Sequence, residues 1–405
     1  MGSLPEALPP SDPPSAAAPA GVPSGSGAAT PLRPIRRGLP ELGPFYEQLE
    51  ALARAERDTP VRVLWLGDSH TAADFMTERV RARLFEVAGA GGPGFVHVGL
   101  GAYRHGSVRV ETSGRWRHQP ILPAQRARVM DGVFGYGGQR TIPTAGATAR
   151  LELKGGSWPR GQQMRWTIAV RLAPGDKLQI GWADQTRTLG AEPSEKPVEV
   201  SFVAPAESPF SVRHLAGSPE VFGVFVERVI PGALLDNVGI NGARVATPLA
   251  WEPAQYERVL QSHRPDLLVL AYGTNEAFDK TDPARYGEHY RELVGRVRRA
   301  APAVPCWIIG APDAATSDGR SITRLAPILD VQERVARELG CAFTSAQQAM
   351  GGEGSFERWL RASPPLARSD RIHLTVAGYD TLGQRLADAL LPAADAGTTL
   401  VKRAP

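Results

Sequence analysis

The chain has 405 residues, 42% apolar and 22% charged, so it can bury a sizeable core and is not disordered throughout. This length predicts two globular units, or one large unit with an insertion. The formal charge of +4 comes mostly from arginines scattered among acidic residues, which argues against a nucleic-acid partner, and the sequence predicts no membrane span and no signal peptide.

The first segments in chain order are a tether, a helix and a buried strand. Residues 1–43 are rich in Pro, Ala, Gly and Ser and are expected to form a disordered tether. Apolar residues then recur at helical spacing up to about Arg57. Residues 61–66 are apolar almost throughout, which predicts a buried strand ending in a sharp turn, and a helix over 74–87 follows.

The middle of the chain has a different pattern. Short alternating stretches at 150–153, 165–172, 177–182 and 198–203 are separated by Gly and Pro turns. This pattern is typical of an antiparallel β-sandwich.

Strands and helices alternate again after Asp236. The pattern predicts strands at 267–272, 306–310 and 341–344, and helices at 283–300, 322–339 and 375–391. Such alternation indicates a parallel sheet with both faces covered, hence an α/β fold interrupted by a β-sandwich. The expected division is a tether (1–43), a first catalytic part (44–105), an insert (106–235), a second catalytic part (236–392) and a flexible tail (393–405).

Four polar blocks stand where chemistry is expected. In parallel α/β sheets, ligands bind outside the carboxyl ends of the strands. Two blocks follow predicted strands directly, and the other two are a glycine-containing loop and a segment before the last helix. The blocks are Gly67-Asp68-Ser69-His70, Gly273-Thr274-Asn275-Glu276, the loop 237–243, and Asp370-Arg371-Ile372-His373.

These blocks contain the parts of a serine esterase. A serine hydroxyl needs a base to accept its proton and a carboxylate to orient that base. Asp370 and His373 have the spacing for that pair, with Ser69 as the nucleophile. The developing oxyanion needs hydrogen-bond donors, which the backbone N–H groups of Ser69 and Gly242 and the amide of Asn275 can supply.

The order of the blocks resembles the SGNH/GDSL hydrolase superfamily, and a Gly-x-Ser-x-Gly elbow is absent. The resemblance implies a three-layer α/β/α, flavodoxin-like fold. It also implies Ser69 as nucleophile, His373 as base with Asp370 behind it, and Ser69, Gly242 and Asn275 as oxyanion donors. The stretches at 67–74, 91–95 and 273–276 look like those of bacterial peptidoglycan O-acetylesterases, which carry a β-rich carbohydrate-binding-like insert.

The function expected from this resemblance is a serine acetylesterase acting on an O-acetylated polysaccharide, such as peptidoglycan. Two alternatives stay open: a polysaccharide O-acetyltransferase on the same fold, which the presence of Asn275 disfavours, and a non-catalytic carbohydrate-binding protein. We expect no cofactor, no metal and a monomer. The resemblance implies a periplasmic or extracellular location.

Several residues near the blocks have a structural alternative that we prefer. Asp68 is expected to cap turn N–H groups rather than act as an acid, and His70 is not expected to be the base. Gly239 is expected to serve loop conformation rather than to bind the oxyanion. Glu276 is expected to be solvated or to cap a helix rather than contact substrate.

Residues of the insert and the cysteines are interpreted in the same way. The insert aromatics are expected to be core rather than sugar-stacking platforms; they are Trp116, Tyr136, Trp158, Trp166 and Trp182. Arg104 and Arg140 are expected on the solvated surface rather than as substrate clamps. Two cysteines exclude a disulfide scaffold and a Cys-based zinc cluster, and Cys306 and Cys341 are expected to be free buried thiols, although consecutive strands could bring them together.

Overall fold

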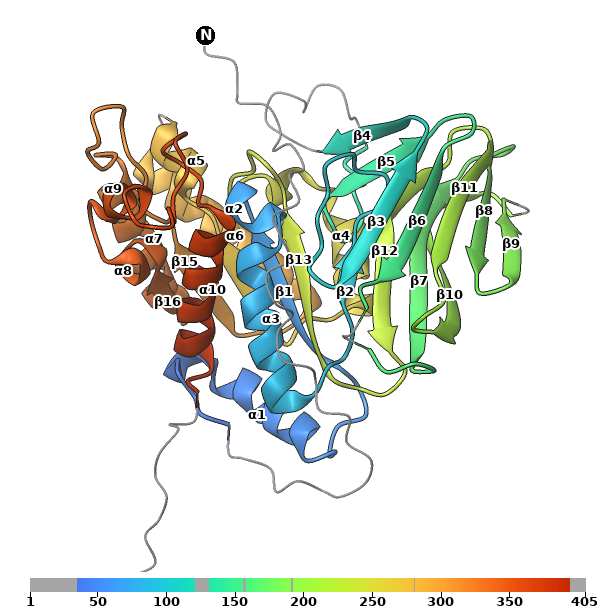
Figure 1. Ribbon diagram of the computed structural model, residues 1–405, viewed down its shortest axis with the longest axis horizontal. Coiled ribbons are helices and arrows are strands. Elements are labelled where there is room, and N and C mark those ends of the chain that lie inside the picture. The colour runs from blue at the N-terminus through green and yellow to red at the C-terminus, as the bar shows by residue number, and fades with distance from the viewer. Residues whose placement is uncertain (1–34, 121–130, 156–157, 191, 280, 394–405) are drawn as a thin grey trace, which may run out of the picture.

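The computed structural model describes residues 35–120, 131–155, 158–190, 192–279 and 281–393. One of its two parts is a parallel sheet covered by helices on both faces (Figure 1). The strand order in this sheet is β13 (Ala233–Gly239), β1 (Val61–Gly67), β14 (Leu267–Ala271), β15 (Cys306–Gly310) and β16 (Ala342–Ser345). In chain order this is 2-1-3-4-5, the flavodoxin-like arrangement. The predicted α/β fold is confirmed.

The sheet separates two apolar cores because side chains of β1 alternate between its faces. Leu64 and Leu66 belong to one core, and Val63 and Trp65 to the other. The helices of the first core are α4 (Pro253–Ser262), α5 (Thr274–Phe278), α6 (Pro283–Ala300) and α7 (Leu325–Leu339). Those of the second are α1 (Gly43–Ala53), α3 (Phe75–Ala88), α8 (Ala346–Met350), α9 (Ser355–Leu360) and α10 (Val376–Leu390). Shorter elements are α2 (Ser69–Ala72) and the 3₁₀ turns η1 (Pro40–Leu42) and η3 (Pro248–Ala250).

Two antiparallel sheets form the predicted insert (Figure 1). One has the order β10 (Ser194–Pro205), β7 (Gln163–Leu172), β12 (Glu220–Arg228), β5 (Gln139–Pro143) and β4 (Trp116–Pro120), with β2 (Gly94–Val96) also paired to β12. The other has the order β3 (Val108–Ser113), β6 (Thr148–Leu153), β11 (Phe210–Ala216), β8 (Lys177–Trp182) and β9 (Gln185–Leu189). Apolar side chains of both sheets, such as Ile168 and Ile180, form a third core. The predicted β-rich insert is confirmed.

The two parts are joined by a shared core and a buried ion cluster. Phe95, Tyr136 and Phe225 pack in the same apolar core as α4 and the parallel sheet. Arg62 of β1 pairs with Asp236 of β13 and with Glu227 of β12. Strand β13 begins before the expected boundary at residue 235, and β2 pairs with the insert although it precedes residue 106. The division into two parts of a catalytic domain and an insert stays a prediction.

The insert aromatics take part in packing. Tyr136 and Trp166 are buried, and the other three pack against the core of the sandwich; they are Trp116, Trp158 and Trp182. The expectation of a solvated position is wrong for Arg140, which is buried, whereas Arg104 keeps 33% of its side chain exposed. Arg140 pairs with Asp131 and Glu220, and Arg104 pairs with Glu78.

The ends of the chain and the cysteines differ from expectation. The tether and tail predictions over 1–34 and 394–405 lie outside the described residues, but Gly38 N–H donates to Leu390 O and Leu42 is buried, so order begins before residue 43. Cys306 and Cys341 form a disulfide, so the prediction of free thiols is wrong. Parallel pairing of Trp307 with Ala342 places the preceding cysteines side by side, with 4.6 Å between their Cα atoms.

In the part of the chain that the structure describes, no helix has the length and apolar character needed to cross a membrane.

Candidate active site

The register of the parallel sheet brings three of the polar blocks together. Gly67, at the end of β1, lies opposite Gly239 of β13 on one side and Ala271 of β14 on the other. The loops that follow these strands therefore leave the sheet at the same edge. Ser69 stands two residues beyond its strand, and Asn275 stands four residues beyond its own.

The turn that carries Ser69 is fixed by Asp68. Asp68 is the N-cap of α2, and its Oδ1 accepts a hydrogen bond from His70 N–H at 3.0 Å. The side chain is 1% exposed, and this burial raises its pKa to about 7. Asp68 thus caps the turn, as expected, and its carboxyl points away from solvent.

Ser69 lies in a chain of hydrogen-bonded groups that ends at Asp370. Ser69 Oγ is 2.9 Å from His373 Nε2, and His373 Nδ1 is 2.9 Å from Asp370 Oδ2. A carboxylate can only accept, so Nδ1 carries the imidazole proton and Nε2 is left to accept from the serine hydroxyl. The side chain of His373 is 19% exposed, so a ligand can reach this chain from solvent.

The loop before α10 keeps Asp370 ionised. Its Oδ1 accepts hydrogen bonds from the backbone N–H groups of Ile372 and His373, at 3.0 and 2.9 Å. Partial burial favours the neutral acid, but the hydrogen bonds from the His373 side chain and from these two N–H groups outweigh it and hold the pKa of Asp370 well below its usual range. The carboxylate is therefore available to orient the imidazole at every pH of interest.

His70 is turned away from the serine hydroxyl. Its Nδ1 lies 3.0 Å from the hydroxyl of Tyr379, and the residue is 5% exposed. Burial, with a further contribution from the nearby His373, lowers the pKa of His70 to about 3. His70 is a neutral, buried side chain that packs beneath His373, with 5.4 Å between the ring centroids.

Gly239 is the last residue of β13 rather than part of the expected loop, and its surroundings differ from those of Gly242 in the loop beyond. A Cβ at Gly239 would lie 2.3 Å from Ala72 N, so only glycine lets β13 pack against α2. The Gly239 N–H donates to Asn237 Oδ1 at 3.0 Å and is occupied. Gly242 has φ +75° and open space where a Cβ would be, and no acceptor in the described residues pairs with its N–H. Of these two groups, the N–H of Gly242 is the one free to bind an oxyanion.

The amide of Asn275 has one fixed and one free N–H. Asn275 Nδ2 donates to Ala243 O at 2.8 Å, which ties the loop after β14 to the loop after β13. An amide nitrogen carries two protons. The second one is therefore presented in a fixed orientation at the half-buried surface of this edge.

Glu276 joins the same two loops from below. Its Oε1 accepts from Val245 N–H at 2.8 Å, and its Oε2 accepts from Gly273 N–H at 3.1 Å. The side chain is 1% exposed, and burial raises its pKa to about 7. Glu276 caps α5, which matches the preferred expectation, and its buried position leaves it no contact with a ligand.

The sequence did not single out Asn237 or Asp74 as supports of the site. Asn237 lies within β13, not in a loop, and its Nδ2 donates to Thr71 O at 2.8 Å and to Asp74 Oδ1 at 3.0 Å. Asp74 in turn pairs with the buried Arg81. These contacts hold α2 and α3 against β13. The signal was available: two polar residues, Asp236 and Asn237, interrupt an apolar run, and buried polar groups need partners.

The surroundings of the site contain a small cavity. A cavity of about 20 Å³ lies behind the Ser69 turn, lined in part by Asp68, His70 and Thr274, and is too small for a substrate. Within the described ranges, no three His, Cys, Asp or Glu side chains come together in a way that could hold a metal ion.

Comparison with known proteins relates this geometry to a family. The sequence model of the GDSL-like Lipase/Acylhydrolase family matches residues 211–381, which include Gly242, Asn275, Asp370 and His373 and begin after Ser69. A solved structure of a peptidoglycan O-acetylesterase has a TM-score of 0.72 at 27% identity, over 88% of this chain and 97% of that one. A search of curated proteins found no match.

Two further solved structures have a much lower similarity to this chain. A family two carbohydrate esterase from Clostridium thermocellum has a TM-score of 0.29 at 11% identity, over 69% of this chain and 96% of that one. A carbohydrate acetylesterase from Sinorhizobium meliloti has a TM-score of 0.29 at 18% identity, over 38% and 77%. The family match over residues 211–381 and the first structure, taken with the flavodoxin-like sheet, show a GDSL-like lipase/acylhydrolase domain on an SGNH-type α/β fold, and this chain is a carboxylic ester hydrolase.

Proposed function

We propose that this enzyme removes O-acetyl groups from a carbohydrate, with Ser69, His373 and Asp370 as its catalytic triad and peptidoglycan as its substrate. The observation that carries the proposal is the pair of 2.9 Å contacts from Ser69 Oγ to His373 and from His373 to Asp370. The similarity to a peptidoglycan O-acetylesterase over 97% of that chain supports the choice of substrate.

The acylation step follows from these contacts. Ser69 Oγ attacks the acetyl carbonyl carbon while His373 Nε2 takes the hydroxyl proton. Asp370, ionised and hydrogen-bonded to Nδ1, stabilises the imidazolium that forms. His373 then gives the proton to the sugar oxygen, and the bond between the acetyl carbonyl carbon and that oxygen breaks. The sugar leaves with a free hydroxyl group, and the acetyl group remains on Ser69.

The oxyanion of this step is assigned to three donors. The N–H groups of Ser69 and Gly242 and the second N–H of Asn275 leave from loops that start at one sheet edge. The bond from Asn275 Nδ2 to Ala243 O holds the amide before substrate arrives. Donors that are already oriented pay no reorganisation cost when charge develops on the carbonyl oxygen.

Hydrolysis completes the cycle. Water attacks the acetyl-serine while His373 takes one of its protons, and acetate leaves as the proton returns to Ser69 Oγ. In a transferase, a sugar hydroxyl would replace this water. Both reactions use the same oxyanion donors, but related transferases often lack an asparagine at the position of Asn275, so its presence favours hydrolysis.

The test is acetate release from O-acetylated peptidoglycan and from acetylated xylan. Wild type is expected to release acetate from peptidoglycan faster than from xylan, and Ser69→Ala is expected to release none from either. Ser113→Ala, at an exposed position of β3, is the matched control and should behave as wild type. Release by Ser69→Ala would remove Ser69 as nucleophile, and equal rates on both polymers would remove the preference for peptidoglycan.

A non-additivity test addresses the pairing of Ser69 with His373. Ser69→Ala, His373→Ala and the double variant should lose nearly the same activity, because triad members act as a unit. Losses that add would show that the two residues act independently.

We also propose that the enzyme works outside the cytoplasm. The disulfide between Cys306 and Cys341 fits an oxidising compartment. Acetylated wall polymers, the proposed substrate, lie in the same place. Fractionation of cells followed by activity staining tests this location.

A further inference from the structure

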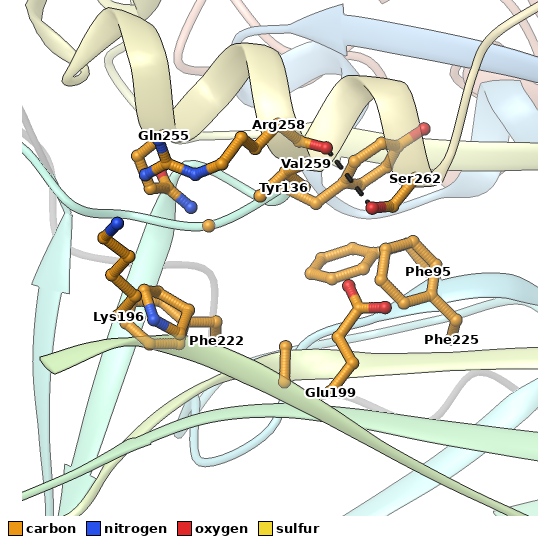
Figure 2. A pocket seen from close by; sticks show the side chains of 13 residues that line it. Phe95, Tyr136, Lys196, Glu199, Phe222, Phe225, Gln255, Arg258, Val259 and Ser262 are labelled. Carbon is orange, nitrogen blue, oxygen red and sulfur yellow. Dashed lines mark hydrogen bonds between the residues drawn. The ribbon is translucent and has the colours of Figure 1, made fainter. Parts of the chain in front are cut away.

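A cavity of about 270 Å³ lies between helix α4 and the β-rich insert, and it shares no lining residue with the Ser69 site. Figure 2 shows the helix on one side, with the strands of the insert facing it. Pockets for drug-sized ligands usually have ~300 to 1,000 Å³, so a cavity at the lower limit suits a single small ring.

Buried aromatic side chains line the cavity at both of its ends (Figure 2). Phe95, Phe222 and Phe225 are each 1% exposed, and Tyr136 is 2% exposed, yet all four line the cavity. Tyr136 is held in place by the hydrogen bond from its hydroxyl to Asp236 Oδ2, at 2.6 Å. One face of Phe225 is covered by the stacked ring of His263, so these residues offer apolar ring edges, against which the C–H face of a ligand ring can pack.

Gln255 is the polar group that distinguishes this cavity from a packing defect. It is 3% exposed, and neither its Oε1 nor its Nε2 has a hydrogen-bond partner in the structure. Leaving both ends of a buried amide unpaired is unfavourable, because each group has lost its hydrogen bonds to water without gaining others. Gln255 lines the cavity from the first turns of α4 (Figure 2), and rotation of its side chain toward a ligand there would give the buried amide the partners that it lacks.

Charged groups give the cavity two different ends. Arg258 and Lys196 extend to the end where Gln255 lies, as Figure 2 shows, and neither is paired with an acidic side chain among the described residues. Glu199 lies further along, and its Oε1 is 2.9 Å from His263 Nε2. The first end attracts an anion, whereas a carboxylate at the second end repels one and accepts hydroxyl protons.

We propose that this cavity binds one carboxylate-bearing sugar residue, separately from the ester site. The carboxylate meets Arg258 and Lys196, and an acetamido or hydroxyl group satisfies Gln255. A ring hydroxyl donates to Glu199, and the C–H face of the ring packs on the Phe95 and Phe225 side. Neither a lone anion nor a neutral sugar uses all of these groups.

The test is an NMR titration with N-acetylmuramic acid, which carries both a ring and a carboxylate. Wild type is expected to bind it with a Kd of about 1 mM, and to bind N-acetylglucosamine, which lacks the carboxylate, at least about tenfold more weakly. Lactate, a carboxylate without a ring, is expected not to bind. Absence of N-acetylmuramic acid binding, or equal binding of either partial ligand, would overturn the proposal.

Two variants assign the binding to this cavity. Arg258→Gln should weaken binding by about tenfold or more, as expected for a hydrogen-bonded ion pair. Gln255→Leu should also weaken it. Arg285→Gln, which removes the same charge from an exposed position on α6, is the control and should bind as wild type. If Gln255→Leu does not fold, the surface variant Arg258→Gln still decides the question, and unchanged binding by it would overturn the proposal.

An activity measurement separates this proposal from the proposed esterase function. Hydrolysis of a small activated acetate ester by Arg258→Gln should equal that of wild type, because the cavity shares no residue with the Ser69 site. Binding requires no hydrolysis, so the titration stays informative whatever the enzyme hydrolyses. A loss of small-ester hydrolysis in Arg258→Gln would show that the cavity is coupled to the ester site and would overturn its assignment as a separate one.

Discussion

Replacement of Asp370 by asparagine should reverse the direction of one hydrogen bond in the site while keeping the loop intact. Asp370 Oδ1 accepts from Ile372 N–H and His373 N–H, and an asparagine oxygen can keep both bonds. The amide nitrogen would then face His373 Nδ1, where Oδ2 now lies at 2.9 Å. An amide nitrogen donates and does not accept, so Nδ1 would lose its proton and Nε2 would gain it.

The expected loss follows from the contact between His373 and Ser69. A protonated Nε2 at 2.9 Å from Ser69 Oγ would donate to the hydroxyl and could not take its proton. In serine hydrolases this change of tautomer costs about 10⁴ in kcat, equivalent to about 5.4 kcal/mol in the barrier. The carboxyl of Asp370 is 36% exposed, so ring rotation and solvent soften the effect, and we expect a loss of roughly 10³- to 10⁴-fold.

The assay is kcat for a small activated acetate ester, combined with nitrogen NMR of the histidine ring. Asp370→Asn should move the proton of His373 from Nδ1 to Nε2 with little change in KM. Asp388→Asn, an exposed carboxyl that pairs with Arg83, is the control and should keep both kcat and tautomer. A kcat within tenfold of wild type, or a large loss without a change of tautomer, would refute this reasoning.

Three other predictions concern the oxyanion donors, the disulfide and the buried acids. Asn275→Ala should lower kcat by about 10²- to 10³-fold with KM little changed, and an unaltered kcat in steady-state assays would exclude it from the oxyanion hole. Replacing Cys306 and Cys341 by alanine should lower the free energy of unfolding by about 3–4 kcal/mol in urea titrations, because the disulfide closes a loop of 35 positions, and kcat should stay the same because the bond lies at the opposite edge of the sheet from the site. Burial raises the pKa of Glu276 to about 7, so the folded state binds more protons than the unfolded one and stability should fall as pH rises from about 4.5 to 7. Glu276→Gln should reduce the dependence of the free energy of unfolding on pH, measured at several pH values. The same pH dependence in both proteins would show that the pKa of Glu276 is not raised by folding.

Long periodic segments were predictable because their signals are local. The helix expected at 283–300 is α6, Pro283–Ala300, where Asp282 caps the first turn and proline occupies its first position. The strand expected at 306–310 is β15, whose residues are all buried. In such elements the apolar pattern and the cap agree with the tertiary structure, so the sequence alone is enough.

Elements whose polar residues have distant partners were missed. Strand β13 contains Asp236 and Asn237, which break its apolar run and conceal it from a pattern search. Asp236 is fully buried because Arg62 and Tyr136, far away in the chain, supply its partners. Such partners cannot be inferred from local sequence, since they depend on how the sheet and the insert are assembled.

The candidate site was predictable in its members but not in their supports. The four polar blocks stand next to strand ends or before a helix, which the sequence shows directly. The contacts that orient them, such as Asn275 with Ala243 and Glu276 with Val245, join loops from different strands. The disulfide was mispredicted for a similar reason, because its formation depends on the pairing register of β15 and β16.

The position of β13 in the chain has a consequence for folding during synthesis. Strand β1 is completed at Gly67, but its neighbour β13 begins only at Ala233, after the whole insert. At ribosomal rates of ~5–20 residues per second, β1 waits on the order of ten seconds for this partner, and longer for β14 on its other side. During that time a strand that is apolar except for Arg62 has two open edges. We therefore expect the sandwich to fold first, and expression of the chain to depend on chaperones that cover β1 until the parallel sheet can close around it.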